Sequence, residues 1–264
     1  MSLPQDNKVK SETSILPLKL ASIALSAITI LLCLALSSLF LDKTNGYFVD
    51  TPLVIVVYVS MLLTAVSAVC LLALTNKESK LTPNGSMPSV AVSFLPGIAA
   101  IPTFLGIFGQ GDGKIALFMS LTALFPIFFN RYSKMPTALR LSAGFLQAIF
   151  AILAIGLLYF DMTTELNNPV KVFLMLGLAS VIVATLGELR IALGMNSAGY
   201  YVASKVLSFT LSACGAFPAI FASIAGIDKF PTSYLFLAVF ILGYSIYSAY
   251  DLFTLSVAHD GDSI

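Results

Sequence analysis

The sequence predicts an all-α, polytopic membrane protein in which eight helices cross the bilayer. Three properties of the 264-residue chain support this fold class: 58% of its residues are hydrophobic, only 10% are charged, and its mean hydropathy is +0.95. A soluble domain carries about 25% charged residues, so a water-soluble globule and a disordered chain are both excluded. The formal net charge of +1 leaves no basic surface for the phosphates of a nucleic acid, and we expect no nucleic-acid partner.

Eight apolar stretches have the composition of membrane-spanning helices, each of which needs about 20 residues. Polar turns separate them, and no loop is long enough to hold a folded domain outside the membrane. The expected spans are residues 18–41, 53–75, 89–108, 115–130, 138–160, 172–195, 198–224 and 233–257. They form two tandem four-helix membrane units, residues 17–134 and 135–258. A polar tail (1–16), which we expect to be disordered and cytoplasmic, precedes them, and a short C-terminal tail (259–264) follows.

The positions of the basic residues orient these spans. The side of the membrane that holds the N-terminal tail and the alternate loops receives ten basic residues: Lys8, Lys10, Lys19, Lys77, Lys80, Arg131, Lys134, Arg140, Arg190 and Lys205. The other side receives four: Lys43, Lys114, Lys171 and Lys229. Because cytoplasmic loops carry the excess of Lys and Arg, both termini are expected in the cytoplasm. The short loops and compact chain favour the cytoplasmic membrane of a bacterium.

The two four-helix units resemble each other in sequence. Residues 16–133 align with residues 135–251 at an offset of 115 to 121 positions. The alignment matches Asp42 with Asp161, Pro52 with Pro169, Pro102 with Pro218, and Asp112 with Asp228. Units of four spans both enter the membrane from the same side, which makes them parallel repeats related by a pseudo-two-fold axis along the membrane normal. Parallel repeats occur in secondary transporters, with sites at the repeat interface; alternatively, the duplication only enlarges a stable bundle.

The first candidate site is a pair of helices interrupted by proline. Pro102 and Pro218 lie in the corresponding spans 89–108 and 198–224. Proline frees a backbone carbonyl that must be satisfied in lipid, and such spans in both halves point to a binding site at the membrane midplane. Ser208 and Ser212 are hydroxyl residues that would line it. The alternative is structural: the prolines only bend their helices, and the serines belong to a row of small residues that makes 198–224 the most crowded helix.

The second candidate site is a group of charged residues toward the cytoplasmic side of the second unit. Glu188, Arg190, Lys205 and Asp251 come from three successive spans and lie at a similar depth. A lone charge at mid-helix costs about 2.5–3.5 kcal/mol, so such residues pair or face a cavity. We expect the ion pairs Glu188–Lys205 and Lys205–Asp251. The group is either a ligand site or gate, or a set of charges that reach the membrane interface and anchor the helix ends.

One uncharged polar residue completes the candidates. Gln147, halfway along 138–160, is the only amide deep in a span, and it either hydrogen-bonds another helix or contacts a solute. No metalloprotease, nucleophile-elbow, phosphate-loop or Cys-x-x-Cys motif is present, and the single histidine, His259, lies in the C-terminal tail. We therefore assign no catalytic residue, expect neither a metal nor another cofactor, and treat an enzyme as the less favoured class.

These features favour transport. The leading hypothesis is a transporter of a small solute or ion, or the membrane subunit of one, with the charged group as a cytoplasmic gate. The rival hypothesis is a non-catalytic scaffold or accessory subunit whose Ser, Ala and Gly faces bind another membrane protein. A third is a membrane enzyme that acts on a lipid with Lys205 and Asp251. The expected partners are the lipid bilayer, a small solute or ion and, under the rival hypothesis, another membrane subunit.

Overall fold

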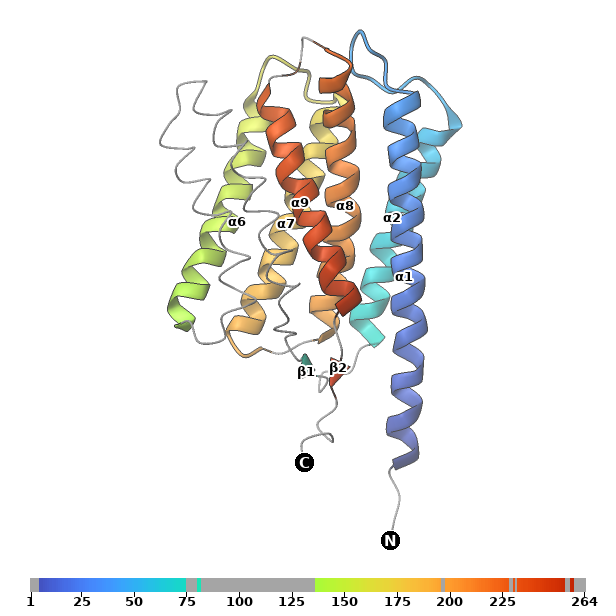
Figure 1. The fold of residues 1–264 in the computed structure, drawn as a ribbon, viewed down its shortest axis with the longest axis vertical. Coiled ribbons are helices and arrows are strands. Elements are labelled where there is room, and N and C mark those ends of the chain that lie inside the picture. The colour runs from blue at the N-terminus through green and yellow to red at the C-terminus, as the bar shows by residue number, and fades with distance from the viewer. Residues whose placement is uncertain are drawn as a thin grey trace.

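The described part of the chain folds into six long helices and one small two-stranded sheet (Figure 1). The computed structural model describes residues 5–74, 80–81, 136–195, 198–227, 230, 232–254 and 257–258. The helices are α1 (Gln5–Leu39), α2 (Pro52–Leu74), α6 (Thr137–Phe160), α7 (Pro169–Ala192), α8 (Ala198–Ile224) and α9 (Thr232–Thr254). The strands β1 (Lys80–Leu81) and β2 (Val257–Ala258) pair antiparallel. The predicted spans 89–108 and 115–130, and Pro102 with them, lie outside the described residues.

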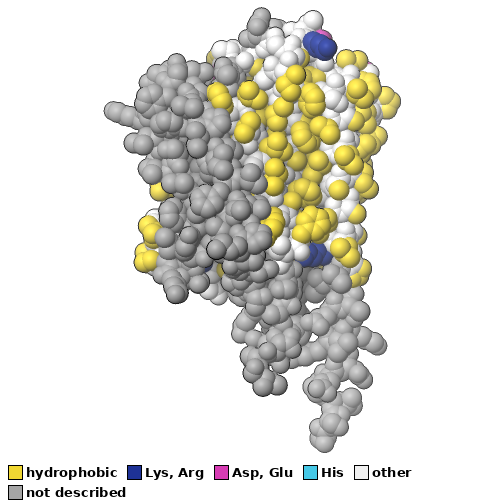
Figure 2. Space-filling model, viewed as in Figure 1, with side chains coloured by type: hydrophobic (Ala, Val, Ile, Leu, Met, Phe, Trp, Pro, Cys, Tyr) yellow, Lys and Arg dark blue, Asp and Glu magenta, His cyan; other side chains and the backbone are white. Residues whose placement is uncertain are grey.

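Each of these six helices has the length and hydropathy of a membrane span. In α1 the spanning portion is Pro17–Leu39, and in α9 it is Tyr234–Thr254. Hydrophobic side chains cover the visible face of the described helices, and basic side chains appear near its two ends (Figure 2). On α1 and α2, Leu31, Ile55 and Leu62 are 63%, 67% and 64% exposed, as suits side chains in contact with lipid. The chain is a multi-pass, all-helical membrane protein.

The ends of α7 differ from the predicted span 172–195 for local reasons. The helix begins three residues earlier, at Pro169, because proline is favoured in the first helical turn and the Asn168 side chain accepts a hydrogen bond from the Val170 amide at 3.0 Å. Such a cap satisfies one of the free amides at a helix start. The helix ends three residues earlier, at Ala192, and Gly194 follows with φ +77°. Glycine adopts this left-handed conformation without strain.

The helices alternate in direction, and α8 lies at the centre of the described bundle. We call the end at which α1 begins and α9 ends the lower end, as it appears in Figure 1, and the opposite end the upper end. Helices α1, α6 and α8 run upward, and α2, α7 and α9 run downward (Figure 1). Helix α8 contacts α1, α2, α7 and α9. The sequence predicts that the helix at 198–224 is crowded by its neighbours, and its contacts with four other helices agree with this prediction.

The serine row of α8 joins it to its two neighbours. Ser208 accepts a hydrogen bond from Ser248 of α9 at 3.0 Å, and Ser212 lies 2.8 Å from the hydroxyl of Ser180 on α7. Ser208 and Ser212 are fully buried. This favours the packing interpretation of the row. It also removes these two serines as a contact face for another membrane protein, because α7 and α9 of the same chain already cover them.

Two similar turns lie at the upper end. The Asp42 carboxylate accepts hydrogen bonds from the Thr44 amide at 2.9 Å and the Thr44 hydroxyl at 2.7 Å, and Asp161 accepts the same pair from Thr163 at 2.9 and 2.7 Å. The bonds from Thr44 hold the pKa of Asp42 below its usual value. Burial opposes ionisation of Asp161, but hydrogen bonds, first among them that of Tyr234 at 2.5 Å, outweigh burial and lower the pKa of this carboxyl as well. Each turn follows an upward helix and precedes a downward one.

Candidate functional site

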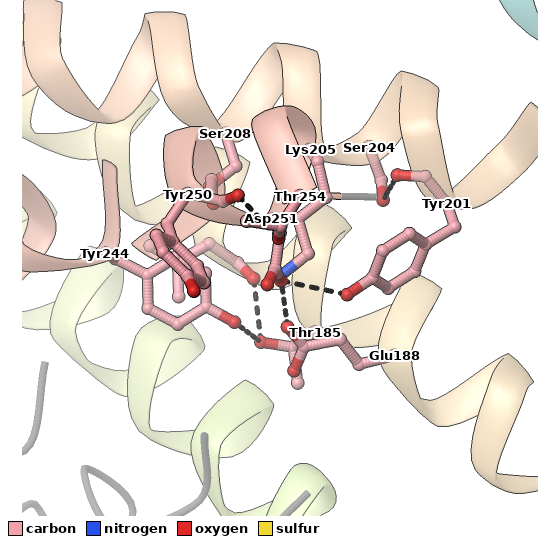
Figure 3. Close-up of polar contacts among 12 residues, drawn as sticks. Thr185, Glu188, Tyr201, Ser204, Lys205, Ser208, Tyr244, Tyr250, Asp251 and Thr254 are labelled. Carbon is pink, nitrogen blue, oxygen red and sulfur yellow. Dashed lines mark hydrogen bonds and ion pairs between the residues drawn. The ribbon is translucent and has the colours of Figure 1, made fainter. Parts of the chain in front are cut away.

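Three charged side chains meet inside the described bundle, and we call them the ion cluster: Glu188, Lys205 and Asp251. Glu188 lies one turn before the end of α7, Lys205 lies two turns into α8, and Asp251 lies in the last turn of α9. All three positions are near the lower end. Lys205 Nζ forms an ion pair with Glu188 Oε1 and lies 3.0 Å from Asp251 Oδ2 (Figure 3). Both ion pairs expected from the sequence are thus present.

The burial of the ion cluster distinguishes between the two interpretations of these charges. Glu188 and Lys205 are 0% exposed and Asp251 is 6% exposed. A side chain that anchors a helix end at the membrane interface keeps its charged group in contact with water, and these three do not reach the protein surface. The anchoring interpretation therefore fails for Glu188, Lys205 and Asp251.

Arg190 lies apart from the ion cluster. It is exposed, and its guanidinium lies 4.8 Å from the centre of the Tyr200 ring. Glu188 and Arg190 are two positions apart, which separates them by about 200° around the helix axis. Arg190 thus shares charge and depth along the helix with the cluster but not its burial.

Three tyrosines surround the Lys205 ammonium. Its Nζ lies 4.1 Å from the ring centre of Tyr247, 5.2 Å from that of Tyr201 and 5.8 Å from that of Tyr244. The Tyr201 hydroxyl also donates to Asp251 Oδ2 at 2.9 Å. A cation over aromatic rings is stabilised by about 2 kcal/mol when it is removed from water. The signal in the sequence was the spacing of Tyr244, Tyr247 and Asp251, which places them on one face of a helix.

The ion cluster contains one acid more than its single base can neutralise. Lys205 contacts both carboxylates, but Glu188 Oε2 is buried and makes no well-formed hydrogen bond in the described part of the chain, although the Tyr247 hydroxyl lies near this carboxyl group. Nearly all buried polar atoms in proteins are hydrogen-bonded, so an exception points to a missing water, ion, proton or ligand. Glu188 is therefore the residue of the cluster that is open to a further partner.

Gln147 extends the polar region from the ion cluster toward α6. Its side chain is 0% exposed, and neither its Oε1 nor its Nε2 has a hydrogen-bond partner among the residues that the structure describes. It lies beside the Tyr244 hydroxyl, which is 3.4 Å from the hydroxyl of Thr185 on α7 (Figure 3). Four helices thus contribute polar groups to one buried region. Gln147 thus approaches α9 at Tyr244, and its two expected roles, a hydrogen bond across helices and contact with a solute, both stay predictions.

The proline-centred candidate site lies in another part of the bundle. Pro218 is buried in α8, 13 residues beyond Lys205, a separation of about 20 Å along a helix. Ser208 and Ser212 lie between the two levels and are hydrogen-bonded to neighbouring helices. The described residues therefore bring Glu188, Lys205, Asp251 and, through Tyr244, Gln147 into one region, and they leave Pro218 outside it.

The chemistry available to this region is the binding of a proton, an ion or a small polar molecule. Among the described residues, no three His, Cys, Asp or Glu side chains lie close enough together to hold a metal ion. Hydroxyl, amide and carboxyl groups provide both donors and acceptors, and Lys205 and the two acids provide charge. The chain matches no protein-family model, no curated protein and no solved structure.

Proposed function

We propose that the protein transports a small polar solute or an ion, alone or as the membrane subunit of a transporter, across a bacterial cytoplasmic membrane. One observation supports this function: among the described residues, the buried amide of Gln147 and the buried Oε2 of Glu188, a member of the ion cluster, make no well-formed hydrogen bond. The polar region between α6, α7, α8 and α9 is the proposed binding site. The ion cluster is the proposed gate near the cytoplasmic end.

Energetics favour a functional role over a structural one. Buried ion pairs lose their hydration, and replacing them by well-packed apolar residues is often neutral or stabilising. A bundle selected only for stability therefore has no need of Glu188, Lys205 and Asp251. Within membrane spans, ionisable residues mark the pathways of ions, protons and substrates. We propose that the cluster is closed in the observed arrangement and opens when α7 and α9 separate.

We further propose the duplicated eight-span architecture. The turns at Asp42 and Asp161, which the sequence alignment pairs, make the same two hydrogen bonds to a threonine two residues later. The aligned Pro52 and Pro169 each begin a downward helix, and α1 and α6 both run upward, as parallel repeats require. These similarities support a common origin for the α1–α2 and α6–α7 pairs.

The position of β1 supports two further spans before α6. Strand β1 and the start of α6 both lie at the lower end (Figure 1), as the proposed eight-span architecture requires. Two crossings fit the apolar stretches 89–108 and 115–130. In a variant without native cysteines, we expect Asp112→Cys to react with a membrane-impermeant maleimide from outside intact cells, and Ser263→Cys to react only after the cells are opened. Protection of position 112 in intact cells would contradict the eight-span proposal.

The transport proposal is tested most directly by Gln147→Leu. Removing an unsatisfied buried amide should stabilise the protein by about 1–3 kcal/mol and, if Gln147 contacts the solute, abolish ligand binding. We would follow thermal unfolding of the detergent-purified protein against ions, amino acids, nucleosides, sugars and lipids, and then test each stabilising compound for uptake into vesicles. The expected result is saturable stabilisation of the wild type that the more stable Gln147→Leu variant lacks.

A matched control lies five residues away on the same helix. Ser142 is exposed, and its hydroxyl bonds only the backbone of its own helix, 3.0 Å from Ala138 O. Ser142→Ala should leave both ligand-induced stabilisation and uptake unchanged. A well-folded wild type that responds to no compound in the panel would contradict the transport proposal and favour an accessory subunit.

A further inference from the structure

The charge of the ion cluster identifies a specific small ligand. With Glu188, Lys205 and Asp251 all ionised, the cluster would carry a net charge of −1, although all three side chains are removed from water. An isolated buried charge is so unfavourable that an acid in this position takes up a proton instead. Neutrality therefore requires one proton, shared with or held by one of the two carboxyl groups.

The hydrogen bonds of the two acids differ, and the difference locates the proton. Asp251 Oδ2 accepts from the Tyr201 hydroxyl at 2.9 Å and lies 3.0 Å from Lys205 Nζ. Donors of this kind stabilise the ionised form of a carboxyl group. Glu188 receives Lys205 at Oε1, and its Oε2 makes no well-formed hydrogen bond in the described chain, although the Tyr247 hydroxyl lies near this carboxyl group. The proton is thus accommodated best on Glu188 Oε2.

The helices around Glu188 supply the rest of its electrostatic surroundings. The titratable side chains that face it are Lys205 and Tyr201 from α8, and Asp251, Tyr244 and Tyr247 from α9. From α6 comes the neutral Gln147, with Arg140 about 10 Å lower along that helix. Arg190, on the same helix as Glu188, is exposed. On the far side of α8, α1 and α2 contribute apolar side chains.

We propose that Glu188 is protonated at Oε2 while the ion cluster is closed, so that H⁺ is the ion this cluster binds. The consequence for transport rests on the function proposed above. When α7 and α9 separate and water enters, Glu188 ionises and releases its proton to that water, while Lys205 keeps Asp251 as its counter-ion. Closure of the cluster then takes one proton back from the same side. The closed state binds one proton more than the open state, so acid favours closure.

Infrared spectroscopy of the purified full-length protein at neutral pH tests this assignment without any transport assay. The wild type should show the C=O stretch of a buried protonated carboxyl group. Side-chain ¹³C-labelled glutamate should shift this band, and labelled aspartate should not. Glu188→Gln should abolish it. Asp251→Asn should abolish it too, because removal of the Asp251 charge leaves Glu188 as the only counter-ion of Lys205.

Glu165→Gln provides the control. This acid is exposed at the upper end, where the Tyr47 hydroxyl donates to it at 2.5 Å, and its replacement should leave the band unchanged. A wild type without the band, a band that shifts with labelled aspartate, or a band that survives in Asp251→Asn would each overturn the proposal. If the wild type shows no band but is stabilised by Na⁺, and the Glu188→Gln variant is not stabilised, the ligand is a metal cation and not a proton.

The pH dependence of stability gives a second, independent measurement. Above about pH 4.3, an unfolded glutamate is ionised, whereas the folded protein still holds the Glu188 proton. Stability must then fall as the pH rises, and the melting temperature of the wild type should decrease by about 3 °C per pH unit relative to Glu188→Gln. A constant difference between the two proteins from pH 5 to 7 would contradict the proposal. If the infrared band is present but no compound is taken up, the proposed transport function is contradicted and the proposed proton site is retained.

Discussion

Replacing Lys205 by methionine is expected to destabilise the protein by about 3–5 kcal/mol, because the change leaves a buried carboxylate without its counter-ion. Methionine has a similar length, so the loss of charge is the main change. Lys205 is 0% exposed and is the base that contacts both Glu188 and Asp251. Thermal unfolding in detergent should show a decrease in melting temperature of roughly 10 °C.

Two further variants separate charge from packing at this position. Arg190→Met removes a base from an exposed position of α7, and its effect should stay within about 0.5 kcal/mol. Adding Glu188→Gln and Asp251→Asn to Lys205→Met removes every charge of the ion cluster at nearly constant volume, and most of the lost stability should return. A Lys205→Met protein as stable as the wild type would show that the cluster is not closed to water.

The neutral triple variant also separates stability from activity. It retains the shapes of the three side chains but has no charged group that binds or releases a proton. We therefore expect it to fold normally and to have lost transport. This outcome would distinguish a gate from a purely structural ion cluster, for which the triple variant would lose nothing measurable.

The sequence predicted the described helices and the ion pairs because both depend on strong local rules. About 20 apolar residues must form a helix in lipid, and a charge within such a helix must find a partner. Glu188, Lys205 and Asp251 are charged residues at one depth on three successive spans, so their pairing followed. The spacing of two positions already places Arg190 and Glu188 on different sides of the helix, but the exposure of Arg190 outside the ion cluster is known only from the structure.

The remaining features of the site depend on packing between helices that are distant in sequence. Whether Gln147 finds a hydrogen-bond partner is decided by the residues that α7 and α9 place opposite it, and these cannot be read from α6. The contact of Lys205 with three tyrosine rings depends on how α8 and α9 are each oriented about their own axes, which the sequence does not specify. The distance between Pro218 and the ion cluster follows from their positions in one helix. The choice of the cluster as the main site, in contrast, depends on the burial of its members, which only the structure shows.

Gly215→Ala is expected to destabilise the protein by about 1–3 kcal/mol through overpacking. A Cβ at this position of α8 would lie 2.6 Å from the Phe173 carbonyl oxygen and 2.9 Å from Gly177 Cα, both backbone atoms of α7. Neither can turn aside as a side chain can, so α7 and α8 must move apart. That movement would also strain the nearby contact of 2.8 Å between Ser180 and Ser212.

Alanine substitutions at two other glycines test whether the loss of stability depends on the atoms that the new methyl group meets. At Gly177 of α7, the nearest atom is the flexible end of Ile241, at 2.6 Å, and the closest backbone atom is 3.5 Å away, so Gly177→Ala should cost less than Gly215→Ala. At Gly156 of α6, no atom lies within 4 Å, and Gly156→Ala should stabilise its helix by about 0.8–1.0 kcal/mol. From highest to lowest, we expect the melting temperatures in the order Gly156→Ala, wild type, Gly177→Ala and Gly215→Ala. This order would show that close backbone contact between α7 and α8 holds the helices of the ion cluster in place. Equal melting temperatures for the Gly215→Ala and Gly156→Ala variants would contradict it, because helix propensity alone makes no distinction between the two positions.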